Sequence, residues 1–383
     1  MDSVLKSFSL KGLQLSNRLV MAPMTRHHSP RHIPGPEVAE YYRRRVEGGV
    51  GLLITEGTVV GHKAANAYPN VPSFYGEEAL ASWKQVVEEV HKAGGKIFPQ
   101  LWHVGSVRQA HSCSNTGVDN PQKQCCCEDH IPGYAPSPVA HPYVEGADIP
   151  HEMTEGDIDD VVKAFAQAAF EAKKLGFDGI EIHGAHGYLI DQFFWAYTNR
   201  RKDQYGGESL VDRTRFAVEI IKAIRDAVGD EFPIDFRFSQ WKLGDYNAKL
   251  ATTPNELAAF LHPLVEAGVD LFHCSTRRFW EAEFPNSPLN LAGWTKKLTG
   301  KPTITVGSIG FKEDFITTGM EHSSPHPSAT SLADLLKRLE NQEFDLAAVG
   351  RALLADPFWF RKWVEGREEE IDYFTGESLK KYY

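Results

Sequence analysis

Two histidines and a tyrosine stand close together in the segment His183-Gly184-Ala185-His186-Gly187-Tyr188. Two neutral imidazoles can each donate an N–H hydrogen bond to one substrate oxygen, and so stabilise negative charge that develops on that oxygen. A tyrosine hydroxyl two residues further along can supply a proton to the same substrate. The segment therefore predicts a catalytic site in which His183 and His186 bind an oxyanion and Tyr188 is the proton source.

The same two histidines also permit a metal-site interpretation. An i, i+3 pair on one face of a helix can ligate zinc. However, His183 ends a strand-like run, the glycines on either side of His186 indicate a loop, and no third ligand follows at a suitable spacing. We expect no metal. The chain has sixteen histidines, which could supply a distant third ligand, so a metal-dependent hydrolase that uses His183 and His186 stays open as an alternative.

Hydrogen-bonding residues and glycines also occur where other strand-like runs end. These ends are Ala22-Pro23-Met24-Thr25-Arg26, Thr55-Glu56-Gly57-Thr58, Pro99-Gln100-Leu101-Trp102-His103, Asp235-Phe236-Arg237-Phe238-Ser239, Val306-Gly307-Ser308 and Val349-Gly350-Arg351. Taken singly, Thr25 suits a loop hydroxyl, Gln100 a paired structural group and Gly57 a turn. Their gathering at one end of at least seven strands instead favours a shared binding site.

Two of these strand ends have the character of an anion site. Gly307-Ser308 and Gly350-Arg351 end the seventh and eighth runs, where barrels commonly bind phosphate through backbone N–H groups and a positive side chain. The guanidinium of Arg237, inside an apolar run, needs an acceptor, which an anionic cofactor can supply. No Gly-x-Gly-x-x-Gly follows a strand, so a Rossmann nicotinamide domain is not expected and a tightly held cofactor should lie at the barrel mouth.

The elements that must position these residues alternate along the chain. Short, nearly continuous apolar runs predict strands that are covered on both faces. They are Arg18–Pro23, Gly51–Glu56, Lys96–His103, Gly179–His183, Ile234–Ser239, Leu271–Ser275, Thr303–Gly307 and Leu346–Gly350. Amphipathic stretches between them predict helices over Glu78–Ala93, Ile158–Leu175, Asp212–Val228, Pro254–Ala267 and Ser331–Leu339. Eight strand–helix units favour a single (β/α)₈ barrel, an α/β fold, over residues 1–383.

Smaller signals complete this organisation. Asp157 is the expected N-cap of one helix, and Gly176 and Gly268 are expected C-caps. Phe8–Leu15, with Lys11-Gly12 at its turn, predicts a hairpin that could plug the amino-terminal end of the barrel. Two insertions interrupt the minimal pattern, a loop over about residues 104–153 after the third strand and a surface segment over 319–330.

The composition and net charge limit the classes of binding partner. The net charge is −10 with no basic run longer than that ending Arg43-Arg44-Arg45, which argues against nucleic acid or an anionic membrane as partner. Neither a signal peptide nor a run of 18 apolar residues is present, so we expect a soluble cytoplasmic protein. Cys125, Cys126 and Cys127 are adjacent and lack metal-ligand spacing, so all five cysteines are expected to be free thiols. No particular oligomeric state is predicted.

Several motifs together resemble the Old Yellow Enzyme family. They are Ala22-Pro23-Met24-Thr25-Arg26, Gln100-Leu101-Trp102-His103, His183-Gly184-Ala185-His186-Gly187-Tyr188-Leu189, Asp191-Gln192-Phe193, Asn199-Arg200-Arg201 and Asp203-Gln204-Tyr205-Gly206-Gly207. The resemblance extends from Asn17-Arg18 to Gly350-Arg351-Ala352. It implies a (β/α)₈ barrel that binds FMN non-covalently, with NADPH or NADH as co-substrate.

The resemblance also implies a role for each matching residue. It assigns Thr25 to the flavin C4 oxygen, Gln100 to the pyrimidine edge, and Arg237 to the region of N1 and O2. Pro23, Met24 and Gly57 would line the isoalloxazine, and Gly307, Ser308, Gly350 and Arg351 would bind the phosphate. His183 and His186 would grip a carbonyl or nitro oxygen beside Trp102, and Tyr188 would protonate the α-carbon of an activated alkene such as an enone, enal or nitroalkene.

The resemblance is mixed in one respect. His183, His186 and the segment Asn199–Gly207 resemble the bacterial-type branch, whereas Thr25 resembles the other, longer-known branch. The reaction expected is reduction of activated C=C bonds by NAD(P)H in ping-pong fashion. A flavin-dependent dehydrogenase or isomerase on the same fold is the nearest alternative. An inactive flavin-binding barrel that serves as an interaction protein is another.

Overall fold

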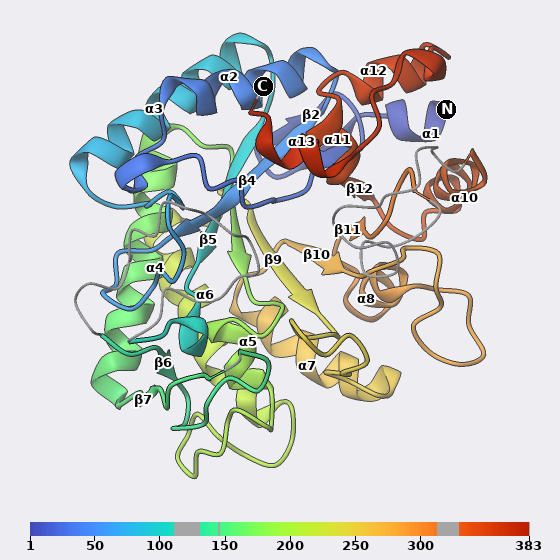
Figure 1. Ribbon diagram of the computed structural model, residues 1–383. Coiled ribbons are helices and arrows are strands. Elements are labelled where there is room, and N and C mark those ends of the chain that lie inside the picture. Colours follow the sequence, from blue (N-terminus) through green and yellow to red (C-terminus); the bar gives the residue numbers. More distant parts are fainter. Residues whose placement is uncertain (111–130, 145, 312–328, 383) are drawn as a thin grey trace.

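The computed structural model describes residues 1–110, 131–144, 146–311 and 329–382, and it contains a closed barrel of eight parallel strands surrounded by helices (Figure 1). The strands follow one another around the barrel in chain order. They are β3 (Leu19–Met21), β4 (Leu52–Val59), β5 (Ile97–Trp102), β8 (Ile180–His183), β9 (Ile234–Ser239), β10 (Leu271–Ser275), β11 (Thr303–Val306) and β12 (Leu346–Val349). The predicted (β/α)₈ fold is confirmed.

The strands agree closely with the apolar runs. β9 and β10 have the predicted bounds, and β5 is shorter by one residue at each end. β4 is the exception, because it continues to Val59, beyond the predicted end at Glu56. Its pairing with β5 shifts register between Ile54 and Gly57, as at a β-bulge. The bulge places Gly57 opposite Gln100 near the carboxyl end of both strands.

Helices follow each barrel strand and cover it from outside (Figure 1). They are α2 (Pro36–Glu47), α3 (Glu77–Lys92), α4 (Glu155–Leu175), α6 (Arg215–Val228), α7 (Pro254–Ala267), α8 (Leu291–Thr299), α10 (Ala329–Glu340) and α11 (Arg351–Ala355). A 3₁₀ turn, η3 (Asp212–Thr214), precedes α6 and accounts for the first residues of the helix predicted there. Gly176 and Gly268 end α4 and α7 with positive φ, as predicted for C-caps.

The predicted cap at the start of α4 is wrong by three residues. Thr154 is the N-cap, because its hydroxyl accepts the Asp157 N–H while the Asp157 carboxylate accepts the Thr154 N–H at 2.8 Å. Asp157 therefore occupies the N3 position of a capping box. A short acidic side chain satisfies donors from either position, so residue type alone did not distinguish them.

The barrel interior is divided into an apolar part and a polar part. Inward residues at the strand beginnings form one buried apolar cluster, which contains Val20, Leu52, Ile54, Phe98, Leu271, Ile304, Leu346 and Ala348. Side chains alternate along a strand, so Gln100 follows Phe98 on the inner face of β5, and His273 follows Leu271 on that of β10. Glu181 and Asp235 occupy the matching inner positions of β8 and β9. The polar residues thus lie above the apolar cluster on one side of the barrel.

A hairpin covers the apolar end. β1 (Phe8–Leu10) and β2 (Leu13–Leu15) pair antiparallel, with Lys11 at positive φ in the turn. Phe8, Leu13 and Leu15 are buried in the same cluster as the inward residues of the barrel strands. The predicted hairpin therefore closes the amino-terminal end of the interior.

Shorter elements make up the remaining described chain. They are α1 (Asp2–Leu5), η1 (Pro30–His32), η2 (Gly105–Val107), β6 (Tyr134–Ala135), β7 (His151–Glu152), α5 (Leu189–Phe194), α12 (Trp359–Val364), η4 (Glu368–Glu370) and α13 (Gly376–Lys380). The loop predicted over 104–153 contains η2, β6 and β7 in its described parts. Cys113, Cys125, Cys126, Cys127 and nearly all of the 319–330 insertion lie outside the described residues.

Cys274 in β10 is a free, buried thiol. None of the helices in the described part of the chain combines the length and apolar character needed to cross a bilayer.

Candidate active site

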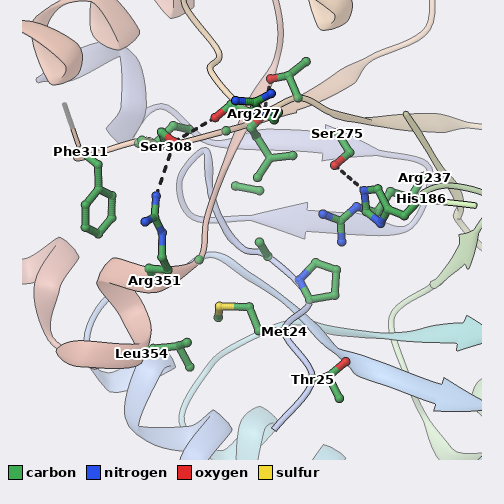
Figure 2. Close-up of a pocket in the computed structure, with 18 of the residues that line it drawn as sticks. Met24, Thr25, His186, Arg237, Ser275, Arg277, Ser308, Phe311, Arg351 and Leu354 are labelled. Carbon is green, nitrogen blue, oxygen red and sulfur yellow. Dashed lines mark hydrogen bonds between the residues drawn. The ribbon is translucent and has the colours of Figure 1, made fainter. Parts of the chain in front are cut away.

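A cavity of about 340 Å³ lies at the carboxyl ends of the barrel strands (Figure 2). Its walls come from β9, β10 and β11 and from the segments that follow β3, β8 and β12. Of the residues singled out in the sequence, those that line it are Pro23, Met24, Thr25, His186, Arg237, Gly307, Ser308, Gly350 and Arg351. Residues from positions 23 to 351 thus meet around one space, as the barrel-mouth prediction required.

One end of the cavity has the features of a phosphate site. Gly307 has φ of 143°, and a Cβ there would lie 2.7 Å from the Thr276 carbonyl oxygen, so only glycine fits. Ser308 follows with φ of 52°, and its hydroxyl donates to the Arg277 carbonyl at 2.9 Å. The Arg351 guanidinium points to Ser308, with Nη2 3.5 Å from Oγ (Figure 2). A cation and a hydroxyl thus meet where the backbone makes a tight turn.

Gly350 keeps that end of the cavity open. A Cβ on Gly350 would lie 3.2 Å from the Sδ atom of Met24, closer than ordinary contact. A larger residue at position 350 would therefore crowd Met24, which lines the same cavity.

At the other end lies Arg237 (Figure 2). It is 7% exposed, and its Nε has no hydrogen-bond partner among the described residues. Burial lowers the pKa of Arg237, whereas the neighbouring Glu181 and Asp235 carboxyls raise it. An arginine stays protonated in proteins, so a buried unpaired N–H of this kind requires an acceptor from outside the chain. An anionic or carbonyl-bearing cofactor meets that requirement.

His183 and His186 lie side by side, with ring centroids 5.1 Å apart and planes at 77°. His186 has φ of 64°, its ring stacks on Trp241 at 4.4 Å, and its Nε2 is 2.8 Å from the Ser275 hydroxyl. Nδ1 of His183 has no partner among the described residues. The two rings are held by packing and by Ser275 rather than by each other.

Both imidazoles are neutral near pH 7. Burial, followed by the charge of Arg237, lowers the pKa of His183 to about 3. The same two causes, in the same order, lower the pKa of His186 well below its usual value. A neutral imidazole can donate one N–H to a substrate oxygen without carrying a charge into the site.

Neither His183 nor Tyr188 lines the cavity, and the two rings contact each other beside it. Tyr188 is the N-cap residue of α5, and its hydroxyl oxygen lies 3.2 Å from that of Tyr68. Its ring meets Trp102 edge-on at 4.9 Å and His183 at 5.2 Å. Burial, followed by the neighbouring Tyr68, raises the pKa of Tyr188 well above its usual value. The phenol therefore keeps its proton at neutral pH.

The loop that carries these groups is tied to the loop after β9 by a buried ion pair. Lys242 Nζ lies 2.5 Å from Asp191 Oδ1, and both side chains are at most 1% exposed. The other Asp191 oxygen accepts the Gly187 N–H at 2.7 Å, and Leu243 N–H donates to the His186 carbonyl at 3.2 Å. These contacts fix the backbone on both sides of His186.

Gly57, Gln100 and Trp102 are buried beside the cavity without lining it. A Cβ on Gly57 would lie 2.5 Å from the Trp102 indole, so glycine is required for these two strands to pack. Gln100 donates from Nε2 to Glu181 Oε1 at 2.6 Å. Trp102 stacks with Tyr68 at 5.5 Å, and its Nε1 has no partner among the described residues.

Several lining residues had not been singled out in the sequence. They are Ala22, Trp241, Ser275, Thr276, Arg277, Val306, Ile309, Phe311, Ala348, Leu354, Phe374 and Leu379. Ser275 ends the predicted sixth strand, so its position at a strand end was an available signal. Phe374 and Leu379 follow no barrel strand and carried no such signal.

The segment with Phe374 and Leu379 is held in place by Arg26. Its Nη2 donates to the Lys381 carbonyl at 2.6 Å, and its guanidinium lies 5.0 Å from the Tyr41 ring and 5.1 Å from the Tyr382 ring. The two rings are stacked on each other with centroids 4.6 Å apart, and the contact of Arg26 with this stacked pair helps to hold one wall of the cavity.

Within the described part of the chain, the group of side chains with metal-ligand spacing is Glu181, Asp235 and His273. It contains neither His183 nor His186. The hydrolase alternative therefore gains no support from the geometry around the histidine pair.

The sequence matches the family described as "NADH:flavin oxidoreductase / NADH oxidase family" over residues 3–370. It is 34% identical to an NADH oxidase of Thermoanaerobacter brockii over 94% of this chain and 50% of that protein. It is 41% identical to 12-oxophytodienoate reductase 7 of Oryza sativa subsp. japonica over 58% of this chain and 55% of that protein.

The fold is similar to that of morphinone reductase in complex with tetrahydroNAD, with a TM-score of 0.76 and 26% identity over 98% of this chain and 93% of that chain. The chain spans about half the length of the first curated relatives that it matches. The cavity has a phosphate-type end, and at the other end the Nε of Arg237 has no partner among the described residues, so the cavity fits a planar phosphate-bearing cofactor. The expectation of FMN and a nicotinamide co-substrate agrees with the family match. This chain belongs to the FMN-dependent NADH:flavin oxidoreductase / NADH oxidase family, the Old Yellow Enzyme family.

Proposed function

We propose that the protein is an ene-reductase, which uses NADPH or NADH to reduce the C=C bond of an activated alkene such as an enone, enal or nitroalkene. The observation that carries this proposal is the placement of two neutral imidazoles and a protonated phenol beside one cavity. When bound, FMN would supply the hydride carrier between the nicotinamide and the alkene. The relatives whose names denote reductases of small molecules support the same class of reaction.

The residues that would hold FMN are those that line the cavity. Arg351, Ser308 and the backbone at Gly307 and Gly350 would bind its phosphate. Arg237, with its unpaired Nε, would lie against the pyrimidine side, where a cation favours negative charge on the cofactor. Pro23, Met24 and Thr25 would contact the ring system, and Gln100 and Gly57 would lie behind it, as the family resemblance implies.

His183 and His186 would bind the carbonyl or nitro oxygen of the alkene, with Trp102 beside them. Addition of hydride to the β-carbon moves negative charge onto that oxygen, and two N–H donors then bind it more tightly than in the ground state. Because burial and the nearby Arg237 keep both imidazoles neutral, they would donate hydrogen bonds without adding positive charge beside Arg237. The His186–Ser275 contact would fix the direction in which His186 donates.

Tyr188 would protonate the α-carbon. Its raised pKa keeps the proton on the phenol until carbanion character develops at the substrate. The hydroxyl of Tyr68, 3.2 Å away and only partly buried, would relay a proton from solvent to Tyr188 after each turnover. All of these residues belong to one barrel, which supports the expectation of a single flavin-binding domain.

The test is a separate measurement of the two half-reactions. Under anaerobic conditions, NADPH or NADH should bleach the bound flavin, and an enone added afterwards should restore its absorbance with formation of the saturated product. Bleaching without reoxidation by enones, enals or nitroalkenes would favour a dehydrogenase or isomerase on the same fold. Protein that binds no flavin would overturn the proposal.

A further inference from the structure

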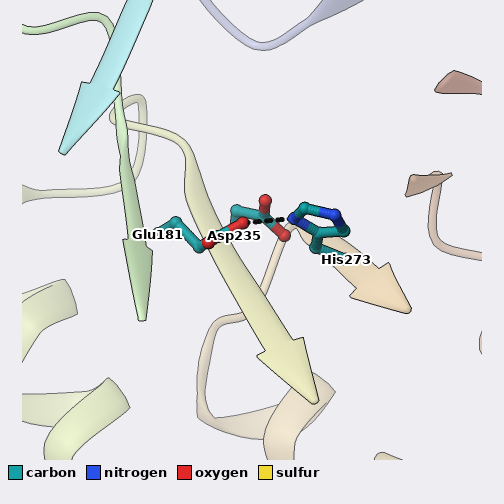
Figure 3. A group of neighbouring side chains, drawn as sticks. All are labelled: Glu181, Asp235 and His273. Carbon is teal, nitrogen blue, oxygen red and sulfur yellow. Dashed lines mark hydrogen bonds and ion pairs between the residues drawn. The ribbon is translucent and has the colours of Figure 1, made fainter. Parts of the chain in front are cut away.

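Beneath the cavity, three ionisable side chains are enclosed in the barrel (Figure 3). Glu181, Asp235 and His273 come from the adjacent strands β8, β9 and β10, and each is 0% exposed. One ligand-type atom from each lies within 4.8 Å of the other two. The proposed reaction uses none of them, so their burial needs another explanation.

Glu181 is the acceptor at the centre of this group. Its Oε1 accepts from Gln100 Nε2 at 2.6 Å, and its Oε2 lies 2.5 Å from His273 Nδ1. The Asp235 carboxyl faces Glu181 in register across β8 and β9, and neither of its oxygens has a hydrogen-bond partner among the described residues. Glu181 thus has two side-chain donors, Gln100 and His273, that stabilise a negative charge, whereas the Asp235 carboxyl faces the Glu181 carboxyl.

The charges in the group must also balance. Arg237 lies two residues after Asp235 on β9, and both carboxyls act on it electrostatically. Burial lowers the pKa of His273, so the imidazole is neutral and donates from Nδ1. Two ionised carboxylates against one guanidinium would leave a net charge buried in the barrel, which is costly. One carboxyl must therefore hold a proton, and the donors around Glu181 place that proton on Asp235.

The electrostatics agree with this assignment. Burial, followed by the neighbouring Glu181, raises the pKa of Asp235 well above its usual value. Burial alone would also raise the pKa of Glu181, but the N–H donated by His273 and the charge of Arg237 lower it.

We infer that Glu181 is a positioning residue of the cofactor site: its single ionised carboxylate, paired with a protonated Asp235, orients the Gln100 amide and balances the charge of Arg237. Because Nε2 of Gln100 is bound to Glu181, the amide oxygen is left as the acceptor for an N–H on the edge of a bound pyrimidine ring. This last consequence rests on the proposed function, whereas the protonation of Asp235 does not.

Replacing each carboxyl by its amide is then predicted to affect FMN affinity to very different extents. Asp235→Asn replaces a neutral group with a neutral donor of the same shape, and FMN affinity should change by less than about threefold. Glu181→Gln removes the charged acceptor of the Gln100 amide and places an amide N–H₂ against that of Gln100, so the Gln100 side chain loses its orientation. Loss of charged hydrogen bonds of this type should weaken FMN binding by about tenfold or more.

A spectroscopic readout on the flavin-free protein completes the test. The infrared spectrum of the apoprotein at pH 8 should contain the C=O band of a buried protonated carboxylic acid, and Asp235→Asn should remove it. Glu181→Gln should remove the same band, because Asp235 then ionises to balance Arg237. If Glu181→Gln does not fold, the comparison of wild type with Asp235→Asn still decides the protonation.

Absence of the band from the wild type, or equal loss of FMN affinity in the two variants, would overturn the inference. A divalent ion that survives dialysis against chelator in the wild type and is lost in Glu181→Gln would show a metal site instead. If the band is present in a protein that binds no FMN, the proposed function fails while the protonated Asp235 stands.

Discussion

The hydroxyl oxygens of Tyr68 and Tyr188 lie 3.2 Å apart, although 120 positions separate the two residues in the sequence. Burial raises the pKa of both phenols. Both rings also contact Trp102, with Tyr68 stacked on it and Tyr188 against its edge. The pair therefore keeps two phenolic protons beside His183, of which only that of Tyr188 is expected to reach substrate.

This relationship leads to a prediction for the variants Tyr188→Phe and Tyr68→Phe. Tyr188→Phe should leave FMN binding and flavin reduction by NADPH nearly unchanged, and should slow reoxidation by enones by about 10²–10⁴-fold, the contribution of one positioned acid. Tyr68→Phe is the matched control, since it removes the neighbouring hydroxyl but not the donor, and should slow reoxidation far less. Stopped-flow measurement of each half-reaction separates the effects.

The substrate in that experiment has to be a simple enone. A nitroalkene yields an anion that is stable enough to leave and take its proton from water, which would hide the loss of Tyr188. An unchanged rate of enone reduction, with only the thermal stability altered, would mean that Tyr188 merely packs at the start of α5.

A second prediction concerns the histidine pair. His186→Ala removes one of two N–H donors to the substrate oxygen and should cost about 2–4 kcal/mol of transition-state stabilisation. Ser275→Ala keeps the imidazole but removes its partner at 2.8 Å, so its effect on kcat/KM should be smaller. The affinity for a phenol, measured from the change in flavin absorbance, gives the effect of each substitution on ground-state binding. Loss of wild-type activity on chelation, with recovery on adding zinc, would instead restore the metal interpretation.

The phosphate end of the cavity can be tested by comparing two flavins. Arg351→Met should weaken FMN binding by roughly 10–150-fold, the range expected for hydrogen bonds to a charged group. It should leave the affinity for riboflavin, which has no phosphate, nearly unchanged. An equal loss for both flavins would mean that Arg351 supports the fold, through Phe311 at 4.3 Å, rather than the phosphate. Chromatography of the released cofactor should identify FMN and not FAD.

The buried ion pair between Lys242 and Asp191 should respond strongly to loss of one partner. Lys242→Met leaves an uncompensated buried carboxylate and should destabilise the protein by about 3–5 kcal/mol. Lys163→Met is the control, because Lys163 pairs with Asp159 on the surface, where such pairs contribute about 0–1 kcal/mol. Urea unfolding measures both. Similar small changes in the two variants would show that Asp191 does not depend on Lys242.

The lowered pKa of His183 predicts two effects of pH. His183 stays neutral down to about pH 3, so binding of a neutral enone should not change between pH 8 and 5 on its account. In the unfolded chain a histidine takes up its proton near pH 6.5. The unfolded state then binds more protons than the folded state, so the free energy of unfolding should fall as pH drops from about 6.5 toward 3. Urea unfolding at pH 7.5 and pH 5 tests the sign.

The barrel strands were predictable because burial on both faces leaves a strong local signal. Ile234–Ser239 and Leu271–Ser275 are buried along their whole length, with apolar side chains on the outer face of the barrel. No other pattern nearby competes with this signal. The residues at their ends could be placed at the barrel mouth for the same reason. α8 (Leu291–Thr299) was not predicted, since it is short and its start depends on the Asn290 side chain accepting the Gly293 N–H.

Contacts between distant parts of the chain left no such signal. Tyr68 is one of 13 tyrosines, and nothing local marks it as the partner of Tyr188. Phe374 and Leu379 reach the cavity on a C-terminal segment to which Arg26, far away in the sequence, donates hydrogen bonds at the Leu379 and Lys381 carbonyls. Glu181 and Asp235 looked like ordinary strand residues in the sequence, because their burial becomes visible only when the barrel closes. Charge balance inside a fold cannot be read from one strand at a time.

The hairpin of β1 and β2 closes the amino-terminal end of the barrel, and the cavity lies at the opposite end. Under the proposed function, the side chains that line the cavity would decide which alkene is accepted, while Phe8, Leu13 and Leu15 are buried at the opposite end of the barrel. Under the proposed function, the oxidised nicotinamide would leave through the same opening by which the alkene enters, so each product would compete with the next reactant for one site. Substitution of the cavity-lining residues would then change the choice of substrate without disturbing the packing of the hairpin.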